Sequence, residues 1–227
     1  MPLETSVRWS LVIPVKVLSQ AKSRITGLAA PRRARLALAM AADTVAAAAT
    51  CPAVATVIVV TDDGDAAAEL AGLGALVLPD EPADGLNPAV GFGAAYAARR
   101  WPGRGRAGMA ADLPALTGDQ LGRALTAAAA ARHAFVADAA GTGTTLYTAA
   151  PGADFRPRFG PGSRDAHRSA GAAELLLPGL DGLRRDVDTI GDLRAAAAIG
   201  LGPRTRAALA AAGGNPICAR SGRSASW

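Results

Sequence analysis

Asp112 is the side chain whose type and position point most directly to chemistry. It lies in the segment Arg106–Leu116 (RAGMAADLPAL), where the apolar run Gly108–Ala111 gives way to Leu-Pro, so we expect it to cap the carboxyl end of a buried strand. Ligands of open α/β sheets bind at that edge. Packing gives no reason for a carboxylate there, because an unpaired buried charge is costly. Holding a divalent metal on a phosphate explains the residue, and a turn or helix-capping aspartate is the alternative.

A second pair of carboxylates lies far along the chain, in Arg184–Leu193 (RRDVDTIGDL). Alternation across Asp186, Val187 and Asp188 predicts that both carboxylates share one face of a strand end. Thr189 or Asp188 is also a candidate cap for the helix that follows. Two separated aspartate sites suit Mg²⁺, which prefers a few carboxylates together with water and substrate phosphate.

Three cations follow the first predicted strand, in Pro14–Arg24 (PVKVLSQAKSR). Lys16, Lys22 and Arg24 at the carboxyl end of a strand form a plausible triphosphate cradle, and a solvated basic loop is the alternative. The segment contains neither a Walker A motif nor G-x-G-x-x-G. A P-loop and a dinucleotide-binding fold are therefore not supported.

Gly-rich segments supply further candidate contacts. Asp80–Gly93 (DEPADGLNPAVGFG) leads into a helix, and its tight turn offers backbone amides and the Asn87 side chain to a base edge. Gly141–Tyr147 (GTGTTLY) and Phe159–Arg164 (FGPGSR) present N–H and O–H donors suited to a phosphate or carboxylate, the second at the start of a helix. Ordinary turns explain each segment equally well on its own.

These segments are positioned by strand-like and helix-like periods that alternate along the chain. The expected strands are 9–15, 55–61, 75–78, the run before Asp112, 134–137 and 144–149, and the expected helices are 31–50, 65–72, 88–100, 117–132 and 189–199. This rhythm predicts a three-layer α/β/α fold around a mostly parallel, mixed sheet. We expect a single domain over residues 1–213 and a disordered tail over residues 214–227.

Composition narrows the function classes. The two cysteines are too few for a disulfide framework, and two histidines argue against a zinc site. No apolar stretch is long enough to cross a membrane and no signal peptide is evident, so we expect a cytoplasmic protein. The net charge of +5 raises nucleic-acid binding as an alternative. Because the arginines are dispersed and no RNA- or DNA-binding signature is present, we expect no nucleic-acid partner.

Six motifs resemble, in their order along the chain, those of the guanylyltransferases of deazaflavin coenzyme F-420 biosynthesis. They are IPVKxLxxAKSR, GLNxA, ADLPxL, GTGTTL, FGxGS and DVDTxxDL. The resemblance spans roughly Ser10 to Gly202. It implies a glycosyltransferase-A-like, Rossmann-like nucleotidyltransferase fold. The first and fourth motifs are specific to this branch, whereas ADLP and DVDT are shared across the wider superfamily. The PVK sequence replaces that superfamily's usual Gly-rich, Arg-containing first loop.

The resemblance also implies roles for individual residues. Asp112 and Asp188, with Asp186 as a further candidate, would hold Mg²⁺, and Lys16, Lys22, Asp112 and Asp188 form the expected catalytic set. The expected nucleotide-binding residues are Lys16, Lys22, Ser23, Arg24, Gly85, Leu86 and Asn87. The expected acceptor-binding residues are Thr145, Gly160 and Ser163.

The implied activity is transfer of GMP from GTP to phosphoenolpyruvate or 2-phospho-L-lactate, with Mg²⁺ as cofactor and release of pyrophosphate. The residues leave the acceptor open. The high Ala and Arg usage indicates a GC-rich genome, and the family's phosphoenolpyruvate users occur in actinobacteria, which favours phosphoenolpyruvate. A downstream transferase that takes the unstable product is an expected partner. The alternatives are another Mg-dependent nucleotidyltransferase, of molybdopterin or sugar-phosphate type, and a non-catalytic nucleotide-binding module.

Overall fold

The computed structural model describes residues 7–18, 22, 24–81 and 83–211. Within them, seven strands form one sheet in the order β3-β2-β1-β4-β6-β5-β7. The strands are β1 (Trp9–Pro14), β2 (Val54–Val60), β3 (Leu76–Leu78), β4 (Gly105–Met109), β5 (His133–Ala137), β6 (Thr144–Ala149) and β7 (Ala173–Glu174). All neighbouring strands are parallel except β6, which runs antiparallel to both β4 and β5. The predicted mostly parallel, mixed sheet is confirmed.

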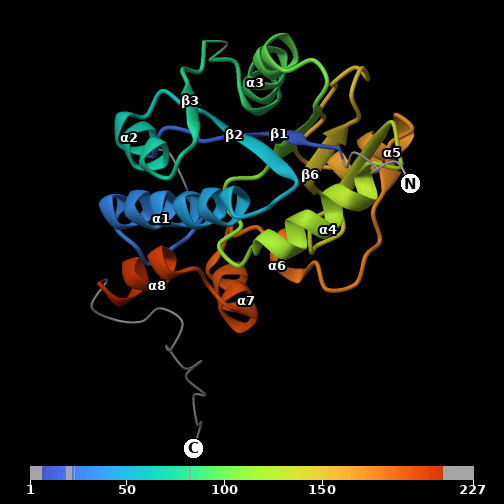
Figure 1. The fold of residues 1–227 in the computed structure, drawn as a ribbon. Helices are drawn as coiled ribbons and strands as arrows, with labels where there is room; N and C mark the ends of the chain where they lie inside the picture. Colours follow the sequence, from blue (N-terminus) through green and yellow to red (C-terminus); the bar gives the residue numbers. More distant parts are fainter. Residues whose placement is uncertain (1–6, 19–21, 23, 82, 212–227) are drawn as a thin grey trace, which may run out of the picture.

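Helices cover both faces of this sheet (Figure 1). The helices are α1 (Ala30–Ala49), α2 (Gly64–Gly72), α3 (Leu86–Arg100), α4 (Gly118–Ala128), α5 (Ser163–Ser169), α6 (Asp181–Arg184), α7 (Ile190–Ile199) and α8 (Pro203–Ala210). Helices α1, α2 and α4 contribute to the core on one face, and α3 packs on the other. The predicted three-layer arrangement follows from these two cores.

Alternation along the central strands supplies both cores. Leu11 and Ile13 of β1 face α1 and α4, whereas Val12 between them faces α3. A parallel strand buried on both faces reads as a continuous apolar run, which is why β1 and β2 are recognisable in the sequence. On the second face α3 lies so close to β1 that a Cβ at Gly93 would be 2.6 Å from Cγ1 of Val12. Gly93 therefore permits the close packing of this helix.

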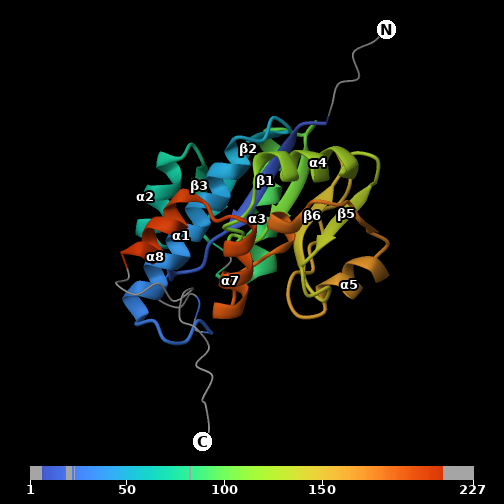
Figure 2. The same cartoon turned by 90° about the horizontal axis from the view of Figure 1, so that it is seen from below.

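The long elements lie within a few residues of their predicted positions, and so does the short β3, but β7, α6 and α8 were not predicted. Helix α8 is an example: it lies beside α1 (Figure 2), and its first amides, those of Arg204 and Thr205, donate to the buried carboxylate of Asp43 in α1 at 3.1 and 2.8 Å. The tail predicted over 214–227 lies outside the described residues. Among the helices that the structure describes, none is long and apolar enough to span a bilayer.

Candidate active site

The loops at the carboxyl ends of β1 and β4 carry Lys22 and Asp112, two of the predicted site residues. These strands are parallel neighbours, and the chain continues from β1 to β2 and β3 on one side while β4 lies on the other. This reversal of strand order is a topological switch point, where open α/β sheets bind ligands. Strand β4 ends at Met109, so Asp112 lies in the loop after it, close to the predicted position. The loop after β1 carries Lys16, which is exposed, and Lys22.

Lys22 joins the two aspartate sites. Its Nζ contacts Oδ2 of Asp112 and lies 3.1 Å from Oδ1 of Asp188. The Lys22 side chain is only 11% exposed, against 51% for Asp188. The Arg24 side chain is exposed, and one of its guanidinium nitrogens lies 3.8 Å from Oδ2 of Asp188. Residues separated by 90 and 166 positions are thus brought together, as the resemblance implied.

Electrostatics keeps Lys22 charged. Burial alone would lower its pKa, but the carboxylates of Asp112 and Asp188 outweigh burial, and the pKa is raised above its ordinary value. The backbone of Lys22 has φ 57°, in the left-handed region that non-glycine residues seldom adopt. Such strain concentrates at functional sites, where the surrounding contacts hold it in place. Ser23, a predicted nucleotide-binding residue, lies outside the described residues.

Asp186 is the most perturbed carboxyl of the site. Burial and the nearby charges of Asp112 and Asp138, with a smaller contribution from Asp188, raise its pKa to about 7. Crowded carboxylates of this kind attract a cation. In the structure that cation is the Lys22 ammonium. Among the described residues, no group of three or more Asp, Glu, His or Cys side chains is arranged so that it could hold a metal ion. The electrostatics fit a cation site, and its occupation by a metal would require Lys22 to move.

The segment from Asp186 to Asp188 is not the strand end that alternation predicted. It is a loop between α6 and α7. It is joined to the loop after β4 by a hydrogen bond from the Val187 N–H to the Asp112 carbonyl at 3.1 Å. Val187 is buried, Asp186 is half-buried and Asp188 is exposed. The alternation is therefore real, but a buried loop residue between two helices produces it rather than a sheet.

Of the two predicted caps for the helix that follows this segment, Thr189 is confirmed and Asp188 is wrong. Thr189 caps α7: its hydroxyl accepts the Asp192 N–H, and the Asp192 carboxylate accepts the Thr189 N–H, which is a capping box. The cap of α4 is Thr117. Asp112 and Asp188 instead direct their carboxylates to Lys22.

Asp138 is a carboxylate near Asp186 that the sequence reasoning did not single out, and its charge is one cause of the raised pKa of Asp186. Its carboxylate accepts the N–H groups of Thr142 and Gly143, each at 2.9 Å, and so folds the loop before β6. A Cβ at Gly143 would lie 2.5 Å from Oδ2 of Asp138, which requires glycine there. The Arg184 guanidinium donates to the backbone carbonyl of Asp138 at 2.9 Å. A carboxylate directly after the predicted strand 134–137 was the available signal.

The predicted acceptor residues include two buried hydroxyls without a partner. The side-chain oxygens of Thr145 and Ser163 are buried and make no hydrogen bond in the structure. A buried hydroxyl left unpaired costs free energy, so a polar ligand at these atoms would stabilise the protein. Gly160, exposed and at φ 131°, accepts the Ser163 N–H at 3.1 Å on its carbonyl. These observations are compatible with the predicted roles, which remain predictions.

Asn87 has a defined partner. Its amide Nδ2 donates to the Phe159 carbonyl at 2.9 Å and its Oδ1 accepts the Phe159 N–H at 2.7 Å. The predicted nucleotide segment Gly85–Asn87, at the start of α3, is thereby joined to the predicted acceptor segment. Contact of Gly85, Leu86 or Asn87 with guanosine remains a prediction.

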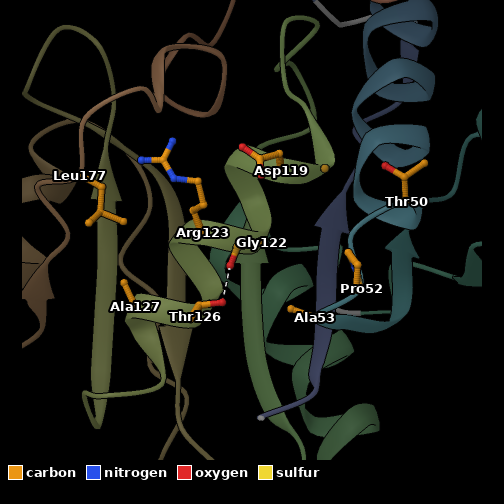
Figure 3. Close-up of a pocket in the computed structure, with 10 residues that line it drawn as sticks. Thr50, Pro52, Ala53, Asp119, Gly122, Arg123, Thr126, Ala127 and Leu177 are labelled. Atoms are coloured by element: carbon orange, nitrogen blue, oxygen red, sulfur yellow. Dashed lines mark hydrogen bonds between the residues drawn. The ribbon is translucent and has the colours of Figure 1, made fainter.

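A shallow groove elsewhere on the surface includes none of the predicted site residues. It lies along α4 and the turn between α1 and β2, and Figure 3 shows residues that line it, among them Arg123, Asp119 and Thr50. Arg123 is already engaged, since it donates to the Pro178 carbonyl at 2.7 Å. The groove is therefore not assigned to the chemistry at the strand ends.

Comparison with known proteins gives a consistent result. A family model described as guanylyl transferase CofC like matches residues 9–169. A protein of Thermomonospora curvata named phosphoenolpyruvate guanylyltransferase is 62% identical, over 93% of this chain and 94% of that protein. A protein of the same name from Streptomyces coelicolor is 54% identical, over 90% of this chain and 97% of its own length.

Solved structures resemble the fold at low sequence identity. A Desulfovibrio desulfuricans protein, whose name places it with the nucleotide-diphospho-sugar transferases, aligns with a TM-score of 0.60 and 17% identity, covering 82% of this chain and 84% of that one. A Mycobacterium tuberculosis protein aligns with a TM-score of 0.51 and 18% identity, covering 84% of this chain and 97% of that one. These likenesses confirm the α/β fold.

Proposed function

The chain belongs to the CofC-like guanylyl transferase family, and we propose that it transfers GMP from GTP to phosphoenolpyruvate with release of pyrophosphate. The observation that carries the proposal is the contact of Lys22 with both Asp112 and Asp188 at the switch point of the sheet. A cation and two carboxylates at that edge are the groups that a metal-bound triphosphate requires. The names of the relatives support phosphoenolpyruvate over 2-phospho-L-lactate.

Asp112, Asp186 and Asp188 are the proposed ligands of a divalent metal ion, which nucleotidyltransferases generally use and which we propose to be Mg²⁺. The raised pKa of Asp186 supports this assignment, because a bound cation would relieve the repulsion that raises it. When bound, Mg²⁺ supplies positive charge to the triphosphate and to the charge that develops during transfer. Lys22, which holds Asp112 and Asp188 here, would then turn its ammonium toward the phosphates.

The proposed reaction is an in-line displacement at the α-phosphorus of GTP. An oxygen of the acceptor phosphate forms the new P–O bond, the bond to the bridging oxygen of the β-phosphate breaks, and its electron pair leaves with pyrophosphate. Lys16, Lys22 and Arg24 would offset the charge of the triphosphate, and Ser23 is a further proposed nucleotide contact. The ionised acceptor phosphate has no proton to lose, so the reaction needs no protein base or covalent nucleophile. Positioning and electrostatics supply the catalysis.

The acceptor would lie against Thr145, Gly160 and Ser163. The unpartnered buried hydroxyls of Thr145 and Ser163 support this placement, because they offer donors to a phosphate or carboxylate. Gly85, Leu86 and Asn87 are the proposed guanosine contacts. The product is a mixed phosphoric anhydride, so we also propose a downstream transferase that consumes it. We place the reaction in the cytoplasm, where GTP and phosphoenolpyruvate are available.

Pyrophosphate release tests the proposal. The purified chain is incubated with Mg²⁺, each of the four nucleoside triphosphates in turn, and either phosphoenolpyruvate or 2-phospho-L-lactate. We expect release with GTP and phosphoenolpyruvate, and none when the acceptor or the metal is omitted. Preference for CTP, ATP or UTP would indicate another nucleotidyltransferase, and no release with any pair would refute a transferase role.

A further inference from the structure

His167 of α5 is a fully buried titratable residue that the proposed chemistry does not use. Its Nε2 accepts the backbone N–H of Arg158 at 2.9 Å, and its Nδ1 lies 3.0 Å from Oγ1 of Thr144. A backbone N–H can only donate, so Nε2 must be unprotonated. The ring is therefore neutral with its proton on Nδ1, which donates to the Thr144 hydroxyl. Burial first, and then the charge of Arg158, lowers the pKa of His167 to about 4, in agreement with this form.

Aromatic rings fix the orientation of the imidazole. Tyr147 of β6 stacks on it, with ring centroids 4.6 Å apart and planes at 17°. Phe159 meets it edge-on at 5.8 Å, and Phe135 of β5 lies tilted at 5.5 Å. Packing on these sides leaves the ring no room to rotate, so both hydrogen bonds keep their direction.

Two elements therefore hold adjacent residues of one loop. Helix α5 holds the Arg158 amide through His167, and the start of α3 holds both backbone groups of Phe159 through Asn87. The loop needs external support, because Gly160 at φ 131° and Gly162 at φ 71° leave its backbone few intrinsic restraints. Ser163 follows directly.

Strand β6 carries Thr145, another proposed acceptor residue. The register between β5 and β6 shifts at this point, since Ala137 pairs with Thr144 and Val136 with Leu146, so Thr145 opposes no residue of β5. Such an irregularity re-aims side chains. Thr144 is the residue that holds His167, and its neighbour Thr145 has the unpartnered hydroxyl. The imidazole thus ties the Thr145 side of the proposed acceptor site to the Ser163 side.

We propose that His167 and Asn87 are positioning residues that hold the segment from Arg158 to Ser163 as a preformed wall of the acceptor site. This proposal rests on the proposed function, because Thr145, Gly160 and Ser163 are acceptor residues only there. Neither residue has to touch the acceptor. Each acts by fixing the backbone that does.

Two substitutions at His167 form a matched pair. In His167→Gln the side-chain Oε1 reaches about as far as Nε2 and can accept the Arg158 N–H, whereas in His167→Asn the side chain is too short. We expect His167→Asn to raise the KM for phosphoenolpyruvate about tenfold, the cost of one buried donor left unpaired. The KM for GTP should stay within about twofold, and His167→Gln should recover most of the loss. Equal effects of Asn and Gln, or an equal rise in the KM for GTP, would overturn the role of His167.

Asn87→Ala separates positioning from direct nucleotide contact. Loss of the guanosine contact proposed for Asn87 raises the KM for GTP, and loss of its hold on the Phe159 backbone raises the KM for phosphoenolpyruvate as well. A rise confined to GTP would overturn its positioning role.

Amide hydrogen exchange tests the clamp without turnover. In the unaltered protein the amides of Arg158 and Phe159 should be protected. His167→Asn should release Arg158, His167→Gln should keep it protected, and Asn87→Ala should release Phe159. Rapid exchange of both amides in the unaltered protein would overturn the clamp. Protected amides in a chain that transfers no nucleotide would refute the proposed function and leave the clamp standing, so the two failures are distinguishable.

Discussion

Asp112→Asn removes one charge from the proposed metal site while keeping the shape of the side chain. At about 4 Å and an effective dielectric constant of about 20, one charge pair is worth about 4 kcal/mol. The Asp112 carboxylate is 23% exposed, so solvent screens part of this. We expect turnover to fall at least about a hundredfold, equivalent to about 2.7 kcal/mol of transition-state stabilisation and comparable to the loss of one electrostatic group from an oxyanion site.

The same change should leave the fold nearly as stable. A partly exposed ion pair contributes at most about 1 kcal/mol. The hydrogen bond from Val187 to the Asp112 carbonyl involves only backbone atoms and is retained. Removing the Asp112 charge also relieves one repulsion that raises the pKa of Asp186. Turnover and melting temperature should therefore respond very differently.

The assay measures kcat, its dependence on Mg²⁺ concentration and the melting temperature for Asp112→Asn, with Asp186→Asn and Asp188→Asn in parallel. Asp119→Asn is the matched control, because it removes an exposed carboxylate from the first turn of α4, outside the predicted site. We expect the control to keep its activity. Near-normal turnover in Asp112→Asn would refute the metal role of this residue, and a large fall in melting temperature with activity preserved would mean that its role is structural.

Three further predictions follow from individual contacts. Lys22→Met should lower turnover by about a hundredfold, because it removes a cation proposed to bind the phosphates, and Mg²⁺ should still bind, because the carboxylates are intact. Steady-state kinetics and Mg²⁺ titration measure the two effects, and loss of Mg²⁺ binding would contradict the prediction. The pKa of His167 is about 4 in the folded protein and about 6.5 in the unfolded chain, so the unfolded chain binds more protons between these pH values. The free energy of unfolding should therefore fall by about 3 kcal/mol as the pH drops from 6.5 to 4. Urea unfolding across that pH range measures this change. If the free energy of unfolding of His167→Gln depends on pH to the same extent, the dependence does not come from His167. Gly143→Ala should destabilise the protein by about 1–3 kcal/mol, because its Cβ would overlap the Asp138 carboxylate, and unchanged urea unfolding would contradict the close contact.

The sequence predicted well those features that local pattern determines. The runs at β1 and β2 and the helix α1 are continuous enough to identify, and their neighbours in the sheet follow from the βα alternation. Helix α8 was missed because its contacts are tertiary: it packs against α1, and Asp43, 161 positions away from Arg204, accepts its first amides.

The site was predicted in part for the same reason. Types and spacing indicated Asp112, Asp186, Asp188 and Lys22, and the resemblance implied that they meet. The loop conformation of Asp186–Asp188 was mistaken for a strand, since one buried valine between helices mimics the period of a sheet edge. The residues around His167 in the sequence gave no sign that it binds the Arg158 amide, because both partners of its ring nitrogens depend on tertiary packing.

The most direct test of the proposed activity is a competition assay with product identification by mass. The unaltered protein is incubated with GTP, Mg²⁺ and equal concentrations of phosphoenolpyruvate and 2-phospho-L-lactate. We predict that guanosine diphosphate-linked enolpyruvate accumulates first and that one pyrophosphate is released for each molecule formed. Preferential formation of the lactate adduct would contradict the acceptor, and the absence of any guanylylated three-carbon acid would contradict the activity itself.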